Sequence, residues 1–370
     1  MDRDTTAAYE AHAHAWVAAR RPRAVEDGRL TAFARRVRRG GRIADLGCGP
    51  GWYADHLRAL GYRVVALDVA HAMLVEAGRR FPHLLRVRAD LATLPFADCS
   101  LDGAWAANCY QHLPRHELPL ALANLHAALR LGASVELTLG NLAHADVCTP
   151  AESEHGETDR RFEDDSLRGR LFSLHSSARA RRLFEGAGFT AISVAPLANP
   201  FWLRIRARRA HTLPDLVGPN LRLLICGLNP SPYSADRGIP FARPGNRFWP
   251  AARRAGLITR ERDPRAALYC GVGFTDLVKR ATASATELRP REYREGVARI
   301  EELAWLYQPK AICFVGLDGW RTAVDRRAQP GWIDSDFAGC PAYLMPSTSG
   351  RNARVPLAEL ARHLRRAASV

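Results

Sequence analysis

Polar residues follow directly after two apolar stretches in the C-terminal half of the chain. Leu223–Cys226 leads into a turn that carries Asn229, and Tyr343–Met345 leads into a turn that carries Ser347–Ser349. Short apolar runs bounded by turn residues predict buried parallel strands. Side chains at the carboxyl ends of such strands lie where open α/β sheets bind their ligands. An amide that can hold a water molecule and hydroxyls that can grip phosphate would then face one crevice.

A second set of polar strand ends lies in the N-terminal half. The segment RIADLGCGPGW combines a short apolar strand, the acidic residue Asp45 and the glycines Gly47, Gly49 and Gly51. Closely spaced glycines let the backbone approach a ligand where a helix begins. The next apolar stretch ends on Asp68, about twenty residues further on, and a carboxylate there can accept hydrogen bonds from both hydroxyls of a ribose. The pattern predicts a nucleoside site.

Two further predicted strands end beside this nucleoside site. The stretch LRVRAD ends on Asp90, which Leu91 follows, and LDGAWAANCYQHLP carries Asn108 and His112. Four strand ends would thus face one crevice. A functional role for His112 at this crevice has an equal alternative, in which His112 is a surface residue at the start of a helix.

The elements that position these residues predict an α/β protein of two domains. At 370 residues the chain exceeds the usual size of a single hydrophobic core, and its apolar fraction of 47% is typical of globular proteins. No apolar run approaches the roughly 18 residues of a membrane span, and the first residues lack the pattern of a secretory signal. We expect a cytoplasmic protein with no membrane partner.

The net charge of +15 favours a nucleic-acid partner, because Lys and Arg neutralise phosphates. Nearly all of this charge is Arg, since Lys occurs only at 279 and 310, and heavy Arg and Ala usage is also typical of GC-rich coding sequences. The portion from His211 onward has 24 basic and 15 acidic residues, a net of +9, and is the more basic per residue. This distribution fits DNA contact by the C-terminal half.

The eight cysteines predict buried thiols, with neither a metal centre nor a disulfide framework. They are scattered along the chain, never as CxxC, and most lie inside apolar stretches. Metal and iron–sulfur ligation need clustered thiolates.

The N-terminal part, residues 1–198, resembles the class I S-adenosylmethionine-dependent methyltransferases in the motifs DLGCGPG and YRVVALD. The resemblance implies a Rossmann-like fold with S-adenosyl-L-methionine as cofactor. It implies that the glycine turn surrounds the methionine moiety, that Asp68 binds the ribose and that Asp90 with Leu91 binds the adenine edge. Asn108 and His112 would border the site of methyl transfer. A degenerate nucleotide-binding fold is the alternative.

The methyl acceptor is not evident from the sequence. Enzymes that methylate amino groups of DNA bases carry an [N/D]PP[Y/F] turn, where this chain has NCYQHLP, and cytosine-C5 enzymes need a Pro-Cys pair, which Cys109 lacks. DNA-base methylation by those routes is disfavoured, so the acceptor is a small molecule or another group. The polar segment 146–172 is interpreted as a lid over the acceptor pocket or as a solvated loop.

The C-terminal part, residues 212–370, resembles the mismatch-specific uracil-DNA and thymine-DNA glycosylases. Four segments agree in order: LPDLV, GLNPSPYSADRGIPFARPGNRFW, CGVGFTDLVKRATASATEL with REYREG, and MPSTSGR. The resemblance implies an α/β fold with a central parallel sheet, duplex DNA with mismatched or damaged bases as partner, and no cofactor. Residues 199–211, which carry four arginines in PFWLRIRARRAH, are predicted to be a basic linker.

The resemblance also implies roles for individual residues. Asn229 would orient the attacking water, Phe241 would stack on the extruded base, and Arg351 would fill the gap left in the duplex. The base pocket would comprise Gly227, Leu228, Pro230, Ser231, Phe241 and Asn246. The DNA-binding residues would be Ser347, Thr348, Ser349 and Arg351. Phe248 and Trp249 are predicted to be core aromatics.

Departures from the family pattern affect the substrate. The usual GINPG is GLNPS here, with Ser231 in place of a glycine near the sugar. Thymine enzymes have GHH where this chain has Gly238, Ile239 and Pro240. They have FTN where this chain has FTD, which ends on Asp276. An aspartate there could activate water as a second catalytic residue, or reshape base recognition. Uracil is therefore the expected substrate, and thymine excision is in doubt.

The resulting hypothesis is a DNA-repair protein in which a uracil-excising glycosylase is fused to an S-adenosylmethionine-dependent methyltransferase. In the alternative, the methyltransferase is the working enzyme and the C-terminal domain is only a DNA-binding module. A scaffold with two decayed sites fits poorly, because both sets of strand ends keep their polar residues.

Overall fold

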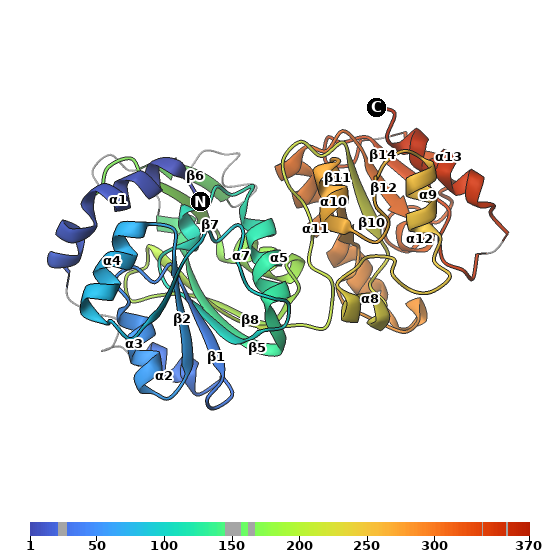
Figure 1. Cartoon of the computed structure of the whole chain (residues 1–370). Helices are drawn as coiled ribbons and strands as arrows, with labels where there is room; N and C mark the ends of the chain where they lie inside the picture. Colours follow the sequence, from blue (N-terminus) through green and yellow to red (C-terminus); the bar gives the residue numbers. More distant parts are fainter. Residues whose placement is uncertain (21–27, 145–156, 162–166, 335, 353) are drawn as a thin grey trace. The chain divides into compact units, whose positions relative to one another are not determined.

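The chain folds into two compact units, each with its own β-sheet (Figure 1). The computed structural model describes residues 1–20, 28–144, 157–161, 167–334, 336–352 and 354–370. The first unit comprises residues 1–185 and 189–210, and the second comprises residues 186–188 and 211–370. Within the described residues, no helix is long and apolar enough to cross a membrane.

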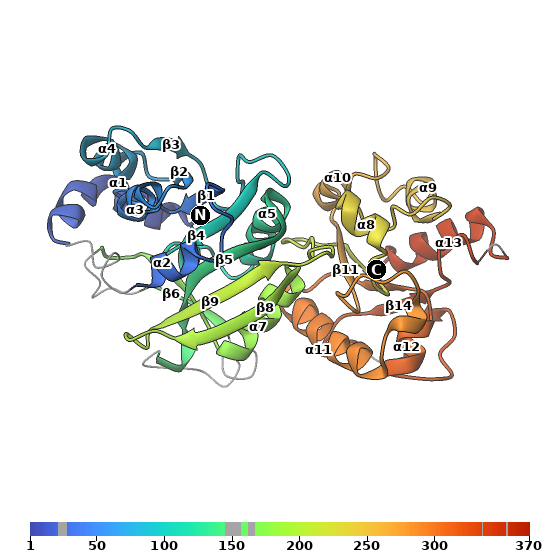
Figure 2. The same cartoon turned by 90° about the horizontal axis from the view of Figure 1, so that it is seen from below.

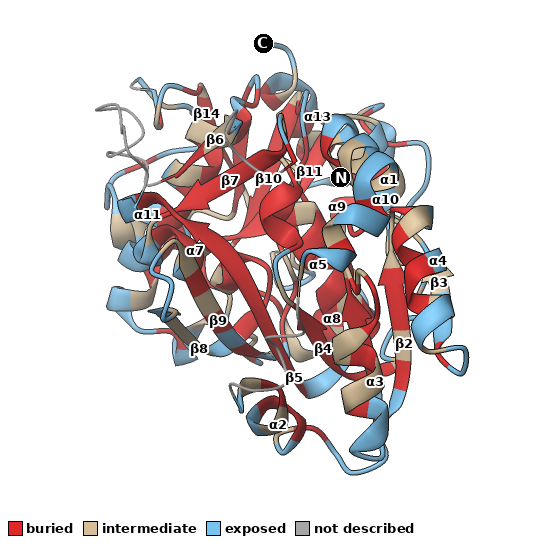
Figure 3. Ribbon diagram, turned by 90° about the vertical axis from the view of Figure 1, so that its left-hand side faces the viewer, coloured by how far each residue is buried: buried red, intermediate tan, exposed pale blue. Residues whose placement is uncertain are grey.

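Five parallel strands form the centre of the N-terminal sheet, in the order β3-β2-β1-β4-β5. They are β1 (Arg42–Leu46), β2 (Arg63–Asp68), β3 (Leu85–Arg88), β4 (Leu101–Ala106) and β5 (Leu129–Asn141). Strands β1 and β4 are buried almost throughout, as the apolar runs predict for strands covered on both faces. Figure 3 shows the burial of the labelled strand β4. The predicted order of strand ends along the chain is confirmed, although β3 ends two residues before Asp90.

Helices cover this central sheet. They are α1 (Arg3–Ala18), α2 (Arg29–Ala34), α3 (Trp52–Ala59), α4 (His71–Arg80), α5 (Leu118–Ala128) and α7 (Ser177–Gly186). Helix α3 packs on β1 and β2, α4 packs on β2 and β3, and α1 packs on α4. Phe33, Ile43, Leu57 and Trp105 belong to the core that these contacts bury.

The predicted basic linker is wrong, because most of it is strand β9 (Trp202–Arg209) of the N-terminal sheet. Strand β9 pairs antiparallel with β5 and with β8 (Phe189–Pro196). Leucine, isoleucine and alanine at 203, 205 and 207 are buried, and arginines alternate with them. Arg204 binds the buried carboxylate of Glu136 on β5 at 2.7 Å. The arginines thus mark the second face of a strand, a period of two that the linker interpretation overlooked.

The polar segment 146–172 also contributes to this sheet. Residues 145–156 and 162–166 lie outside the described residues, so the predicted lid cannot be placed there. Its described part includes β6 (Glu157–Arg161) and β7 (Leu171–His175), which pair antiparallel. Strand β7 also pairs in parallel with the end of β5. A solvated loop is therefore wrong for these strands.

The C-terminal sheet has the order β11-β10-β12-β14-β13, and all of its pairs are parallel except that of β13 with β14. Its strands are β10 (Leu223–Gly227), β11 (Val272–Asp276), β12 (Ile312–Val315), β13 (Gly331–Trp332) and β14 (Ala342–Met345). Strands β10 and β14 confirm the two strands predicted from apolar runs. Both are buried throughout, flanking β12 at the centre of the sheet.

Helices flank the C-terminal sheet on both faces, with α11 and α12 on one face and α9 and α13 on the other (Figure 2). The helices are α8 (Pro232–Arg237), α9 (Phe248–Arg254), α10 (Pro264–Tyr269), α11 (Pro290–Tyr307), α12 (Asp318–Ala323) and α13 (Leu357–Ala367). The predicted core aromatics Phe248 and Trp249 are buried. This layered arrangement leaves the carboxyl ends of β10, β11, β12 and β14 free to form a site.

Candidate functional sites

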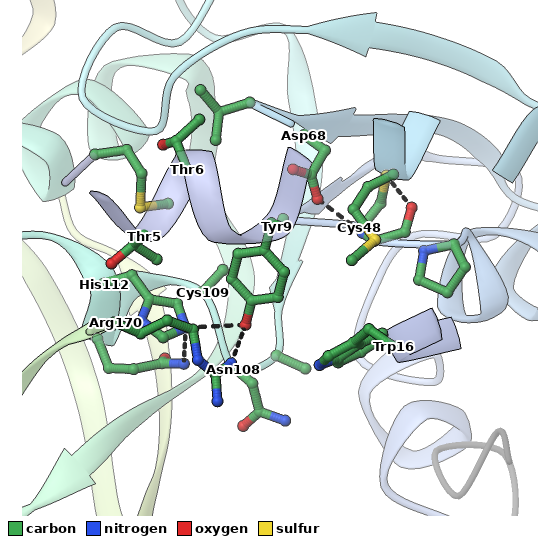
Figure 4. Close-up of a pocket in the computed structure, with 18 of the residues that line it drawn as sticks. Thr5, Thr6, Tyr9, Trp16, Cys48, Asp68, Asn108, Cys109, His112 and Arg170 are labelled. Atoms are coloured by element: carbon green, nitrogen blue, oxygen red, sulfur yellow. Dashed lines mark hydrogen bonds between the residues drawn. The ribbon is translucent and has the colours of Figure 1, made fainter. Parts of the chain in front are cut away.

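The N-terminal unit holds a cavity of about 810 Å³ beside the carboxyl ends of its parallel strands (Figure 4). Of the predicted cofactor residues, those that line it are Gly47, Gly49, Asp68 and Asn108. His112, predicted to border methyl transfer, also lines it. The volume is in the range of pockets that hold a cofactor with a small substrate.

The glycine turn has left-handed backbone at each of its three glycines, with φ angles of 63°, 50° and 83°. A Cβ at Gly47 would lie 2.3 Å from the Cβ of Cys109, so only glycine fits there. A Cβ at Gly51 would meet the side chain of Leu84 at 2.9 Å. Gly51 therefore lets the start of α3 pack closely against Leu84. It does not line the cavity.

Asp68 presents a buried carboxylate at the end of β2. Its oxygens accept hydrogen bonds from the backbone N–H groups of Gly49, at 2.8 Å, and Ala70, at 2.9 Å. Burial raises its pKa to about 6 despite these bonds. Each carboxylate oxygen has a further lone pair, so this group can accept hydrogen bonds from ligand hydroxyls.

Three other predicted cofactor residues lie outside the cavity lining. Asp45 is buried, which raises its pKa well above the usual range, and its Oδ2 has no hydrogen-bond partner among the described residues. The carboxylate of Asp90 binds the amino group of Met1 at 2.8 Å and the backbone N–H of Ala92. Leu91 is a buried core residue.

A hydrogen-bonded chain of three side chains crosses the cavity (Figure 4). Arg170 donates to the Tyr9 hydroxyl at 2.5 Å, and that hydroxyl lies 3.3 Å from Nε2 of His112. Nδ1 of His112 lies 2.6 Å from the carbonyl oxygen of Leu171, which can only accept, so Nδ1 carries the hydrogen of the neutral imidazole. Nε2 is then the basic nitrogen, and it can receive a proton by way of the tyrosine hydroxyl.

No local sequence pattern marks Tyr9, Arg170 and the aromatic rings that complete this lining. The rings come from distant segments and include Trp16, Trp52, Tyr53, Phe172 and Trp202. Trp16 and Trp52 are nearly parallel, with ring centroids 6.4 Å apart. Planar or cationic groups are the ligands that such surfaces favour.

The C-terminal unit holds a second cavity, of about 660 Å³, beside the carboxyl ends of its parallel strands. It brings together nearly all the predicted residues of this half: Leu228, Asn229, Pro230, Ser231, Phe241, Asn246, Asp276, Ser347, Thr348, Ser349 and Arg351. Gly227 does not line it. A Cβ at Gly227 would lie 2.5 Å from Oδ1 of Asp276, so glycine there makes room for the carboxylate.

Asn229 is held by its amide nitrogen. Nδ2 donates to Oγ1 of Thr282 at 2.8 Å and to the carbonyl oxygens of Arg280, at 2.9 Å, and Pro230, at 3.2 Å. These acceptors fix the orientation of the amide. Within the described residues Oδ1 has no hydrogen-bond partner, so it is the group of Asn229 that remains to accept a hydrogen bond from water.

Asp276 ends β11 in register with Gly227 on β10. Burial raises its pKa to about 6, while Lys279 and Arg299 oppose the rise and Asp215 adds to it. Its backbone carbonyl accepts a short hydrogen bond from Arg299. The guanidinium of Arg299 also binds Asp215 at 2.5 Å, which Lys279 contacts at 2.9 Å.

Phe241 lies beside Asp276 with left-handed backbone, at a φ of 55°. One face of its ring stacks on Phe248, with centroids 4.3 Å apart. Oδ1 of Asn246 accepts from the backbone N–H of Phe248, so this side chain buttresses the start of α9. Ser231 caps α8 by accepting from the N–H of Ser234.

The loop after β14 is built by internal hydrogen bonds. Oγ of Ser347 accepts from the N–H of Ser349, and Thr348 is buried, with its carbonyl bound by the N–H of Arg247. The guanidinium of Arg247 holds the carbonyls of Asn352 and Val355 at 2.5 and 2.6 Å. Arg247 and Thr282 are positioning residues that sequence reasoning missed. Arg351 is exposed at the mouth of the cavity.

The residues that the structure describes contain no group of three His, Cys, Asp or Glu side chains able to hold a metal ion. Most of the cysteines are buried, and burial raises the pKa of the Cys109 thiol well above its usual range. A thiol of this kind is a poor nucleophile.

Solved structures similar to this chain resemble it at low sequence identity. One is an S-adenosylmethionine-dependent methyltransferase from Mesorhizobium loti, with 22% identity over 50% of this chain and 99% of that chain and a TM-score of 0.42. A protein from Pyrococcus horikoshii has 18% identity over 50% of this chain and 89% of that chain, with a TM-score of 0.43. A 1,6-didemethyltoxoflavin-N1-methyltransferase from Burkholderia thailandensis has 17% identity over 56% and 88%, with a TM-score of 0.42.

Two family models match separate parts of the chain. Residues 43–132 match the model of a methyltransferase domain, a range that contains the glycine turn, Asp68 and His112. Residues 214–365 match the model of the uracil DNA glycosylase superfamily, a range that contains the whole lining of the second cavity except Leu213. The chain therefore joins a methyltransferase domain with a Rossmann-like fold to an α/β domain of the uracil DNA glycosylase superfamily.

Proposed function

We propose that the C-terminal domain is a monofunctional DNA glycosylase that hydrolyses the N-glycosidic bond of uracil in mismatched duplex DNA. The observation that carries this proposal is the fixed amide of Asn229 in a cavity with an aromatic platform and a hydroxyl-rich loop. Bases inside a duplex are out of reach, so the nucleotide must be extruded into such a pocket before its bond is cut.

Hydrolysis of the N-glycosidic bond does not require a strong nucleophile. As the base leaves, positive charge develops on the sugar, and water can attack the oxocarbenium-like carbon without being fully deprotonated. Oδ1 of Asn229 would accept a hydrogen bond from this water and direct its lone pair at the sugar. Because Thr282 and Arg280 hold Nδ2, the amide does not need to reorganise during the reaction.

DNA contact would involve the loop Ser347–Ser349 and Arg351. The hydroxyl groups of Ser347 and Ser349, which are only half-buried, can bind the phosphates that flank the extruded nucleotide, while the buried Thr348 shapes the loop. Arg243 and Arg321 also line the cavity, so its wall carries positive charge. Arg351, exposed at the mouth, is placed to enter the stack that the nucleotide leaves.

Uracil is the substrate that we propose first. Ser231 caps α8 and lines the cavity, where its hydroxymethyl group takes up space that a glycine would leave open. The methyl group of thymine needs additional room, so thymine and other damaged bases are secondary candidates.

The test is base release from end-labelled duplexes that contain uracil or thymine opposite guanine, uracil opposite adenine, and single-stranded uracil. We expect alkali-labile product from the uracil duplexes, with a loss of 100-fold or more in Asn229→Ala, on the order of the loss when a positioned transition-state group is removed. Thr282→Val should lose less, because Arg280 still holds the amide. Gln329→Ala, an exposed amide outside the cavity, is the control.

Release that persists in Asn229→Ala would overturn the proposed mechanism. No release from any substrate by the wild-type protein would overturn the glycosylase itself. Methyl transfer without base release would then favour the alternative, in which the C-terminal domain only binds DNA.

We further propose that the N-terminal cavity binds S-adenosyl-L-methionine, which supplies an electrophilic methyl group when bound. Two observations fit this molecule: a glycine turn that only glycine can form beside Cys109, and the Asp68 carboxylate, which has lone pairs for ribose hydroxyls. Asn108 lies across the cavity, with its Oδ1 accepting from Thr138 at 3.1 Å. The acceptor would be a small molecule whose proton passes to His112 through Tyr9.

A further inference from the structure

The carboxyl group of Asp276 lies near the Phe241 ring at the wall of the second cavity. Asp276 lines the second cavity from the end of β11, and Gly227, its partner in register, leaves room for it. A Cβ at Gly227 would lie 2.5 Å from Oδ1 of Asp276 and 3.3 Å from Cζ of Phe241. The carboxyl oxygen and the edge of the Phe241 ring therefore approach the same point.

Phe241 defines the plane of the base. Phe248 covers one face of its ring at a centroid distance of 4.3 Å, and Phe241 lines the cavity. A base that stacks on the remaining face lies parallel to the ring, so its hydrogen-bonding edge extends past the ring edge. Asp276 lines the same cavity and lies near the edge of the Phe241 ring, so its carboxyl group can face the base edge.

The protonation state of a carboxyl group decides which edge it can read. A neutral carboxylic acid offers one acceptor and one O–H donor side by side, which complement a ring N–H next to a carbonyl. An ionised carboxylate offers only acceptors, so it attracts the N–H but repels the carbonyl oxygen. Uracil and other deaminated bases present the N–H and carbonyl pair.

We propose that Asp276 is a specificity-determining residue that reads the base as a neutral carboxylic acid and selects bases with a ring N–H beside a carbonyl. The proposal rests on the glycosylase function proposed above and names its substrate class. It makes excision of uracil fastest when Asp276 is protonated.

The surroundings of Asp276 support the neutral form. Burial raises its pKa to about 6, and the aspartate at 215 adds to the rise. Lys279 and Arg299 oppose it, but both cations already bind Asp215, at 2.9 and 2.5 Å. The thiol of Cys226 on β10 is neutral, because its own pKa is raised well above the usual range. The other charged side chains that line the cavity are Arg243, Asp318, Arg321 and Arg351.

Water activation by Asp276 predicts the opposite pH dependence. A general base works only when ionised, so kcat/KM would rise as pH increases through about 6. A base-reading acid works when protonated, so kcat/KM would fall over the same interval. The sign of the profile therefore separates the two roles.

The experiment measures kcat/KM for uracil release from a duplex with uracil opposite guanine, between pH 5.0 and 8.0, in the full-length protein. For the wild type we expect a fall on the order of 20-fold from pH 5.5 to pH 7.5, since a group with a pKa of about 6 loses its proton there. Asp276→Asn has a donor and an acceptor at every pH, so its profile should be flat within about twofold and exceed the wild type at pH 7.5. Asp318→Asn, a second carboxylate of the cavity, should keep the wild-type slope.

A wild-type profile that rises with pH, together with an inactive Asp276→Asn, would overturn the proposal and assign Asp276 to water activation. Flat profiles in both proteins would also overturn it, while the glycosylase would stand. Absence of uracil release by the wild type at every pH would instead refute the proposed glycosylase, and the inference would fall with it.

Discussion

Two carboxylates at strand ends, Asp68 and Asp276, have pKa values of about 6 for the same main reason, burial. Their surroundings differ. Asp68 accepts backbone hydrogen bonds that favour the ionised form, whereas the carboxyl group of Asp276 has no hydrogen-bond partner among the residues that the structure describes. We therefore assign the first to binding hydroxyl donors as a carboxylate and the second to reading a base as an acid.

The assignment of Asp68 predicts pH-dependent cofactor binding. Ligand hydroxyls bind the ionised carboxylate, so the affinity for S-adenosylhomocysteine should weaken as pH falls below about 6 and be constant above it. Titration calorimetry at pH 5.0 and 7.5 measures this change. Asp68→Asn should bind about tenfold more weakly at pH 7.5, because one charge-assisted hydrogen bond is worth roughly 1.5 kcal/mol or more.

Asp55→Asn is the control for this measurement, because Asp55 contacts His83 at 2.7 Å outside the cavity lining. It should bind S-adenosylhomocysteine as the wild type does. Equal wild-type affinity at the two pH values would show that Asp68 does not contact the ligand through its ionised carboxylate.

At the scale of elements, a buried network of charged and polar groups joins helix α11 to the end of β11. Arg299 on this helix binds Asp215, Thr275 and the backbone carbonyl of Asp276. Burial alone would raise the pKa of Asp215, but Arg299 and Lys279 hold it below its usual value. The network thus positions the end of β11, and with it Asp276.

Removal of Arg299 should destabilise the C-terminal domain. Arg299→Met leaves Asp215 buried with only Lys279 as a cationic partner, which we expect to cost about 3 kcal/mol of unfolding free energy. Calorimetric unfolding measures it as a lower transition temperature of the C-terminal domain. The unfolding transition whose temperature rises when S-adenosylhomocysteine is added belongs to the N-terminal domain, which distinguishes the two transitions.

Arg291→Met on the same helix is the matched control. Its guanidinium pairs with Glu295 at 2.6 Å, but both side chains are exposed, at 82% and 59%. Solvent screens such a pair, so we expect no measurable shift. Equal shifts in the two variants would show that the buried network does not stabilise the domain.

At the scale of the whole molecule, each cavity is lined by residues of one unit. The first is lined by residues between Met1 and Trp202, and the second by residues between Leu213 and Val355. The chemistry proposed for each site thus uses side chains of its own unit.

This separation predicts that the two activities can be lost independently. Asn229→Ala should leave the affinity for S-adenosylhomocysteine within about twofold of the wild type, and Asp68→Asn should leave the rate of uracil release unchanged on the same scale. Calorimetry and base release on the same two proteins measure both. A change of tenfold or more across the sites would show energetic coupling between the domains.

Strand ends and turn residues were predictable because their signals are local. Apolar runs of strand length located β1, β2, β4, β10 and β14, and the polar residues directly after them included Asp68 and Asn229. The alternation of arginine with apolar residues in β9 is also a local signal, because it has the period of two of a strand. The linker prediction rests on the charge of the arginines and ignores this period. Asp90 was misplaced by its strand boundary, since β3 ends at Arg88.

The sequence by itself determined which residues end the parallel strands, because periodicity and turn chemistry depend on neighbours along the chain. Only the tertiary structure decided that Tyr9 and Arg170 meet His112, and that Thr282 holds Asn229, since these pairs are separated by tens of residues or more. It also decided that Asp276 is buried beside Phe241. Burial is a property of packing, so the raised pKa on which the proposed base recognition depends emerges only in the folded chain.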